Sequence, residues 1–368
     1  LIADKIRLGT IKTAYKMHKI VLSLHEKCGI IFNKSERLAT SECLPVLNDG
    51  GSCMKKVLFV ASECVPFIKT GGLADVVGSL PKYFNKEEYD VRVILPKYLC
   101  MSEEWKSKMN YVTHFYMDLA WRSQYVGVLE MQYDGVQFYF IDNEYYFAGP
   151  KPYGNIYQDI EKFAFFSKAA LSALPLIGFR PDIVHCHDWQ TGLIPVLLKD
   201  KFHEAIFPRY EVHYHDPQPQ VPGCVGCKDG AGYHRTSDVL FCTGQAGAYG
   251  DANYLKGGIV YADAVTTVSD TYAEEIKTPF YGERLDGLMR ARSNCLRGIV
   301  NGIDYNEYNP ETDKLIEYNY NSRNFRKEKI KNKRALQREL GLEQNDSTFM
   351  IGIVSRLTDQ KGFDLIAT

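Results

Sequence analysis

The residues best suited to chemistry lie in a glycine-rich segment, 69–75, with the sequence KTGGLAD. Two consecutive glycines let a ligand approach the backbone closely, and their N–H groups precede a helix predicted from about Leu73. A helix N-terminus with free N–H groups suits an anion such as a diphosphate, and Lys69 adds a mobile positive charge. The segment predicts a phosphate site at Lys69, Gly71 and Gly72. A plain glycine turn beside a solvated lysine is the alternative.

A second candidate, HCHDWQ at 185–190, follows a predicted buried strand and precedes a helix. Such a position faces the ligand-binding edge of a parallel sheet. Asp188 and His187 could therefore hydrogen-bond a polyhydroxylated ligand, and Trp189 could stack on a sugar. Alternatively, Asp188 caps the helix and Trp189 packs in the core. A metal site is not expected here, because alternate residues of a buried strand point together into packed core.

Two later segments carry polar side chains after predicted strands. Asn301 opens an Asn-Gly sequence, which favours a tight turn with positive φ. The segment is either a bend between domains or a simple turn, and the Asn301 side chain could also reach a ligand cleft. Arg356 and Lys361 lie five residues apart across a strand-to-helix turn. Both could point at one anion and stabilise the charge on a departing diphosphate. Two solvated cations on a loop are the alternative.

These segments need regular elements to hold them, and from Met54 onward apolar runs alternate with helical periodicity. The predicted strands are 57–61, 90–95, 182–186, 264–268, 298–300 and 349–354. The predicted helices are 73–84, 160–176, 191–201, 254–262, one from 271, and 324–341. Residues 110–141 alternate like antiparallel strands. The alternation predicts an α/β protein with a doubly wound parallel sheet, which binds ligands at the carboxyl ends of its strands.

The two ends of the chain depart from this pattern. Residues 1–53 start with Leu and share none of the strand–helix alternation, so we interpret them as a leader or translated upstream sequence before Met54. Their five acidic residues disfavour a transit peptide. We expect 54–310 to form an N-terminal domain. We expect 311–368 to be a linker helix and the truncated start of a second domain, because one strand cannot bury a core.

The stretch 213–247 is anomalous, with three Pro, six Gly, three Cys and three His. A loop of this length without secondary structure is uncommon inside a compact domain, which argues against interpreting the stretch as an ordinary loop. One hypothesis is a frameshift within 212–248: suitable synonymous codons read one base later give FITMIHNLKFQG and onward, which supplies the strand that the alternation lacks there. A second is a zinc site, and a third is a flexible loop. The zinc ligands would be His213, His215, Cys224 and Cys227, with His234 and Cys242 in reserve.

Composition excludes several classes of protein. The 44 Lys and Arg against 45 Asp and Glu give a net charge of −1, which offers no basic field for nucleic acid or membrane lipid. No apolar run approaches the ~18 residues of a membrane span. Ten cysteines are too few for a disulfide scaffold of this length. We therefore expect a soluble, cytoplasmic protein of unknown oligomeric state.

In combination the motifs resemble those of bacterial glycogen synthases, the ADP-glucose-dependent relatives of plant starch synthases. The resemblance covers 54 to about 203 and about 248 to 368. The matching segments are 54–63, 69–75, 139–143, 163–166, 185–189, 261–269, 301–304 and 355–362.

The resemblance implies a GT-B fold, in which two Rossmann-like domains face a cleft. It also implies a retaining glycosyltransferase of glycogen biosynthesis, which moves glucose from ADP-glucose to the non-reducing end of an α-1,4-glucan with no metal or cofactor. The motifs contain no obvious pair of catalytic carboxylates, which agrees with retention through a front-face mechanism. Whether the donor is ADP-glucose or UDP-glucose is left open by these positions.

For individual residues, the resemblance implies ADP-glucose contact by Lys69 and the Gly71-Gly72 loop, and cleft positions for Asp188 and Asn301. Arg356 and Lys361 would be the catalytic pair that stabilises the diphosphate.

The sequence also departs from the family. The histidine of the family's I-H-N motif is absent as written, and the acidic motif and second glycine loop would lie beyond Thr368. We therefore expect little synthase activity from residues 1–368 alone. The alternative function is a non-catalytic glucan-binding or zinc-binding protein derived from a synthase half.

Overall fold

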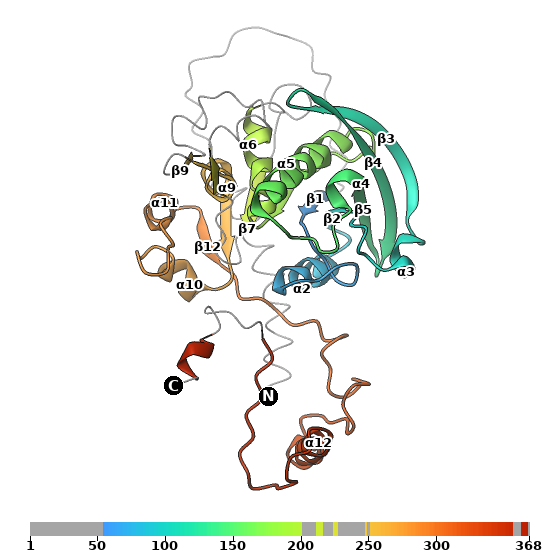
Figure 1. Ribbon diagram of the computed structural model, residues 1–368, viewed down its shortest axis with the longest axis vertical. Coiled ribbons are helices and arrows are strands. Elements are labelled where there is room, and N and C mark those ends of the chain that lie inside the picture. The colour runs from blue at the N-terminus through green and yellow to red at the C-terminus, as the bar shows by residue number, and fades with distance from the viewer. Residues whose placement is uncertain are drawn as a thin grey trace. The chain divides into compact units, whose positions relative to one another are not determined.

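The computed structural model describes residues 54–200, 211–215, 224–226, 247–248, 251–355 and 362–366; for the strand segments between 211 and 252 it describes the backbone alone. The described residues fall into two compact units, one up to Gly302 and the other from Ile303 (Figure 1). Each unit is described by itself. Within these residues, no helix combines the length and apolar character that a bilayer crossing needs.

The larger unit is built on a nine-stranded sheet with the order β12-β11-β7-β6-β1-β2-β5-β4-β3. Its strands are β1 (Lys55–Val60), β2 (Tyr89–Pro96), β3 (Asn110–Leu119), β4 (Arg122–Tyr133), β5 (Val136–Asp142), β6 (Ile183–His187), β7 (Glu211–His215), β11 (Ala264–Thr267) and β12 (Leu296–Gly298). All neighbours from β12 to β5 are parallel, and β4 and β3 add an antiparallel hairpin. The parallel strands therefore share one carboxyl edge. A small separate sheet holds β8 (Cys224–Gly226), β9 (Gly247–Ala248) and β10 (Asp251–Asn253).

Helices connect these strands, and side chains of the sequence mark where several of them begin. Asn155 accepts a hydrogen bond from Tyr157 N at the start of α5, and Ser269 accepts one from Tyr272 N at the start of α10. The helices of this unit are α2 (Gly72–Ser79), α3 (Glu103–Lys106), α4 (Glu144–Phe147), α5 (Ile156–Ala173), α6 (Leu193–Asp200), α9 (Tyr254–Tyr261), α10 (Asp270–Glu275) and α11 (Asp286–Ala291). Short 3₁₀ turns lie at η1 (Leu80–Tyr83) and η2 (Trp189–Thr191).

The core lies where α5 packs beside the sheet and the η2–α6 segment. α5 is buried around most of its circumference, and its residues Phe163, Phe165 and Phe166 are fully buried. Phe59 on β1 and Phe140 on β5 are buried as well. Burying such side chains contributes roughly 2–3 kcal/mol each, so this core fixes the positions at which the strands end.

The predicted alternation of strands and helices is confirmed in this unit, including the antiparallel segment at 110–141. One expectation was wrong. The anomalous stretch 213–247, taken as written, was expected to lack a strand, yet β7 (Glu211–His215) extends into its first residues and pairs in parallel with both β6 and β11. The backbone groups of β6 and β11 that face each other need a strand between them, and this short alternating segment pairs with both. The frameshift hypothesis itself concerns residues that lie mostly outside the described ones.

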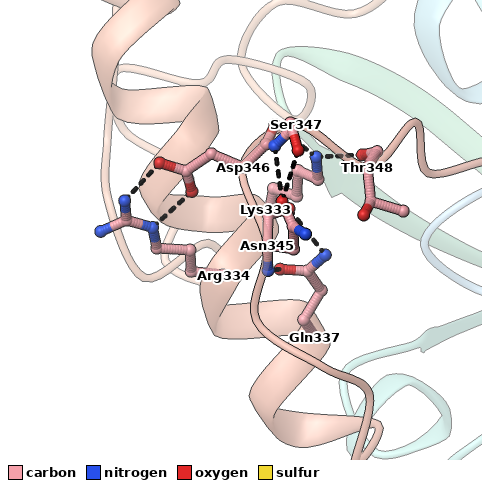
Figure 2. A network of polar contacts seen from close by, with 7 residues as sticks. All are labelled: Lys333, Arg334, Gln337, Asn345, Asp346, Ser347 and Thr348. Atoms are coloured by element: carbon pink, nitrogen blue, oxygen red, sulfur yellow. Dashed lines mark hydrogen bonds and ion pairs between the residues drawn. The ribbon is translucent and has the colours of Figure 1, made fainter.

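The second unit contains α12 (Phe325–Glu339) and the turn η4 (Phe363–Leu365). Side chains of α12 hold the loop that follows it (Figure 2). Arg334 pairs with Asp346 through two hydrogen bonds, one of them 2.5 Å long, and the pair lowers the pKa of Asp346. The buried Gln337 exchanges hydrogen bonds with the backbone of Asn345 at 3.1 and 3.2 Å. The loop is therefore fastened to the helix.

The strand predicted at 349–354 is not formed. The backbone there is irregular, and Phe349, Ile351 and Val354 are exposed. A buried parallel strand needs neighbouring strands for its backbone groups and cover for its side chains. The described residues of this unit supply no strand, so the apolar run alone does not define one.

Candidate active site

The glycine-rich loop follows β1 at the carboxyl edge of the sheet and is held by a buried carboxylate. Oε2 of Glu63 accepts hydrogen bonds from the backbone N–H of Thr70 at 2.5 Å and from its hydroxyl at 2.6 Å. The N–H of Gly71 also interacts with this carboxylate. Burial raises the pKa of Glu63, and the bonds from Thr70 and Gly71 oppose that rise. Glu63 therefore fixes the backbone that leads into α2.

The two glycines leave room for a ligand at the start of α2. Gly71 has extended backbone dihedrals, φ −152° and ψ −169°, and Gly72 is the first helical residue; neither has a positive φ. Among the residues that the structure describes, a Cβ at Gly72 would meet nothing within 4 Å, and one at Gly71 would make ordinary contact with Glu63. Neither backbone conformation nor internal packing thus requires glycine here. Gly71, the N-cap residue, has no side chain to accept a hydrogen bond from the first N–H groups of the helix.

Lys69 lies next to these N–H groups. Its ammonium is 2.7 Å from Oδ1 of Asp75, which stands in the first turn of α2. Both side chains are partly exposed, and such pairs stabilise a protein by only about 0–1 kcal/mol. A phosphate could therefore replace Asp75 as the partner of the Lys69 ammonium at little cost in free energy.

Asp188 directly follows β6, the strand beside β1, and has a strained conformation. Its φ of 61° and ψ of 175° are rare for a residue with a side chain. Its carboxylate accepts a hydrogen bond from the N–H of Trp189 at 2.6 Å. Burial raises the pKa of Asp188 to about 6, and the nearby Glu63 adds to the rise. A strained, largely buried carboxylate with a shifted pKa is a common feature of functional sites.

The ends of β1 and β6 thus bring two carboxylates together, which the sequence analysis did not anticipate. Glu63 and Asp188 interact electrostatically, and both raise the pKa of the buried Tyr153 phenol. Tyr153 is 2.7 Å from the hydroxyl of Ser62. The cluster gives the edge of the sheet several polar groups next to the glycine loop. Its signal in the sequence was Ser62-Glu63 directly after a buried strand.

The structure places Asn301 on the same edge but away from this cluster. It follows β12, which is three strands from β6, or ~14 Å at the usual strand spacing. Asn301 and Gly302 do not have positive φ, so a tight turn with positive φ is not formed; the segment has no regular secondary structure and ends at the boundary between the two units. Arg356 and Lys361 lie outside the described residues.

The other polar residues of the HCHDWQ segment belong to the core. Trp189 is buried edge-on against Phe163 at 5.4 Å, so it does not stack on a ligand. His187 is fully buried and stacks on Phe59 at 5.2 Å, which removes it from the ligand-facing surface. The residues of the zinc hypothesis lie outside the described side chains, and no metal-type cluster occurs among those that are described.

A parallel α/β sheet with an uncapped, glycine-rich helix start at its carboxyl edge defines the Rossmann-like class of ligand-binding domains. Residues 56–291 match the family model of the starch synthase catalytic domain. The chain belongs to this family.

Curated relatives agree with that assignment. The chain is 66% identical over 319 residues to a glycogen synthase of Lachnospira eligens and 64% identical over 320 residues to one of Lachnoclostridium phytofermentans. Each match covers 85% of this chain and 66% of the relative, so the chain spans just under two thirds of their length.

A solved structure supports the same conclusion. The catalytic domain of starch synthase IV from Arabidopsis thaliana, bound to ADP and acarbose, matches with a TM-score of 0.75 and 29% identity. The match covers 86% of this chain and 65% of that one. It confirms the expected α/β fold class of the GT-B type.

Proposed function

We propose that the chain takes part in glycogen synthesis as a retaining glucosyltransferase, which moves glucose from ADP-glucose to the non-reducing end of an α-1,4-glucan. The observation that carries the proposal is the open space at Gly72, at the uncapped start of α2, whose first turn also holds Asp75, the partner of the Lys69 ammonium. That space suits the diphosphate of a nucleotide sugar. The family and its relatives support glucose transfer as the reaction, and the starch synthase bound to ADP supports ADP-glucose as the donor.

In this proposal the diphosphate binds at the start of α2 through the N–H groups of Gly72 and the residues after it. Lys69 exchanges Asp75 for a phosphate oxygen. Arg356 and Lys361 add positive charge, which stabilises the diphosphate as the bond to glucose breaks. The leaving phosphate helps to remove the proton of the acceptor hydroxyl on the same face of the sugar, so that the configuration is retained.

Asp188 and Glu63 have different roles in this account. Asp188 accepts a hydrogen bond from a sugar hydroxyl at the edge of the sheet, where its strained backbone holds the carboxylate. Glu63 keeps the loop in place through Thr70 and acts as a positioning residue. Asn301 lines the cleft farther along the same edge. The expected cytoplasmic location fits a protein that uses a nucleotide sugar and stays a prediction.

The test is a paired measurement on the full-length protein. Calorimetry with ADP-glucose and UDP-glucose gives donor affinity, and chromatography of labelled maltopentaose gives glucose transfer. We expect ADP-glucose to bind more tightly and to extend the acceptor by α-linked glucose. Lys69→Ala should weaken ADP-glucose binding by about tenfold, since a charge-assisted contact contributes roughly 1.5–3 kcal/mol. Transfer from UDP-glucose alone would contradict the donor, and wild-type donor affinity in Lys69→Ala would contradict the site.

A further inference from the structure

The β3–β4 hairpin extends past the carboxyl edge that carries the candidate active site. Asp142, the last residue of β5, is in register with Gly127 of β4, which is in register with His114 of β3. β3 continues for five residues beyond this level to Leu119, or about 17 Å. The hairpin forms the far end of the sheet, opposite β12 (Figure 1).

One face of the hairpin carries four aromatic side chains, which we name the aromatic strip: Tyr111, His114, Tyr116 and Tyr125. His114 and Tyr125 stack with ring centroids 5.7 Å apart and planes at 27°. Tyr116 lies edge-on to Tyr125 at 5.9 Å, its cross-strand partner. Tyr111 and Tyr116 are 60% and 67% exposed. Large aromatic rings gathered at a surface mark an interaction site.

The strip is held rigidly, which lowers the entropy that a ligand would have to remove. The hydroxyl of Tyr111 is 2.5 Å from Nδ1 of His114. The ring of Tyr125 lies across Gly127, where a Cβ would come within 2.9 Å of its hydroxyl. On the opposite face, Met117 and Val126 are buried in the core.

The hairpin is also braced against α5. Arg122 pairs with Glu161, and Lys168 donates a hydrogen bond to the carbonyl of Asp118 near the hairpin tip. Both partners on the helix side belong to α5. The face that carries the strip therefore stays fixed relative to the sheet.

The chemistry of the strip favours a neutral polyol. Asp142, which borders the strip at Gly127, is paired with Lys97 at 3.3 Å, so these two charges offset one another. The strip itself offers flat ring faces edged by tyrosine hydroxyls and an imidazole. A glucose unit has a C–H face that stacks on a ring and a rim of hydroxyls that hydrogen-bonds.

We propose that the aromatic strip binds an α-1,4-glucan chain beside the active site, as an acceptor-holding surface. This inference rests on the proposed function, since it assigns the acceptor of that reaction to this surface. The strip would keep a branch of the polymer near the edge where its end reacts, which raises the effective concentration of acceptor ends.

The test is the affinity of the full-length protein for glycogen, measured by electrophoresis in gels with increasing glycogen. Tyr116→Ala should weaken binding by about tenfold, and Tyr116→Ala with Tyr125→Ala further, because an anchor ring typically contributes more than about 1 kcal/mol. Tyr116→Phe keeps the ring and should bind within about twofold of wild type. Tyr281→Ala, an exposed tyrosine at the opposite end of the sheet, is the matched control.

Transfer to maltotriose, measured alongside, separates the two proposals. Wild-type transfer to maltotriose with lost glycogen affinity in Tyr116→Ala supports the strip. Unchanged glycogen affinity in the double variant overturns the strip while leaving the enzyme intact, and absence of transfer in wild type overturns the proposed function. Because β3 is an edge strand, a second copy of the chain could pair with it, so light scattering is used to measure the oligomeric state. A dimer that dissociates in Tyr116→Ala while glycogen affinity stays unchanged would assign this face to a second copy and overturn the strip.

Discussion

Thr70 donates two hydrogen bonds to one oxygen of Glu63, from its backbone N–H at 2.5 Å and its hydroxyl at 2.6 Å. Glu63 is 3% exposed, so water competes little for these bonds. A single buried acceptor thus fixes the residue directly before Gly71. Glu63 therefore holds the glycine loop through Thr70, and the space at Gly72 stays open to a ligand.

Replacing Thr70 by Val should loosen this loop. The variant removes the hydroxyl and leaves the backbone N–H, so we expect the free energy of unfolding to fall by about 1–3 kcal/mol. Urea unfolding of the purified protein measures the change. ADP-glucose affinity, measured by calorimetry, should fall in parallel because the loop leads into the phosphate site.

Thr70→Ser is the control for that experiment. It keeps the hydroxyl donor, and its affinity for ADP-glucose should stay close to that of wild type. If Thr70→Val and Thr70→Ser have equal stability and affinity, the hydroxyl bond to Glu63 does not hold the loop.

Asp188 should make stability depend on pH. Its pKa is about 6 in the folded protein and 3.8 when unperturbed, so the folded state holds the proton more tightly. Protonated Asp188 therefore adds to the free energy of unfolding; this contribution is complete below about pH 4 and is lost as pH rises through 6. Between pH 4 and pH 7, the stability of wild type relative to Asp188→Asn should fall by on the order of 2–3 kcal/mol. Urea unfolding at both pH values tests this; a constant difference would show that Asp188 has an ordinary pKa.

The strained backbone at Asp188 gives a separate prediction. At φ 61° and ψ 175° glycine is tolerated and other residues are strained, so Asp188→Gly should be about 1–2 kcal/mol more stable than Asp188→Ala. At an ordinary helical position the order is reversed. Both variants should lose most glucose transfer. Thermal unfolding of the pair decides the matter, and an alanine variant as stable as the glycine variant would argue against strain.

Much of the fold was predictable because the signals were local. Buried strands such as β1 and β6 are short apolar runs, and α2 begins at the second residue of a glycine pair. The sequence could not predict the packing that decides exposure. His187 and Trp189 looked equally suited to a ligand and to the core, and Phe59 and Phe163 make them core residues.

Two errors have the same origin. The run at 349–354 is apolar enough for a strand, yet strand formation depends on neighbours that a local pattern does not reveal. β7 was unexpected because its sequence is a weak strand signal, and pairing with β6 and β11 outweighs that weakness. The Glu63–Asp188 pair joins residues 125 positions apart, which only the parallel pairing of β1 with β6 brings together.

The central claim is that the space at Gly72 receives the diphosphate of the donor. Gly72→Ala tests it most directly, because a Cβ there meets no atom of the described residues within 4 Å and improves helix propensity. Gly78→Ala is the contrast: its Cβ would lie 2.3 Å from Cγ2 of Val65, so it should lose about 1–3 kcal/mol of stability through overpacking.

The deciding measurement is ADP-glucose affinity and unfolding free energy on the same preparation of Gly72→Ala. We expect the free energy of unfolding of Gly72→Ala to equal that of wild type or to exceed it by up to about 1 kcal/mol, and its affinity for ADP-glucose to be at least about tenfold weaker. Wild-type donor affinity in a stable Gly72→Ala protein would contradict it.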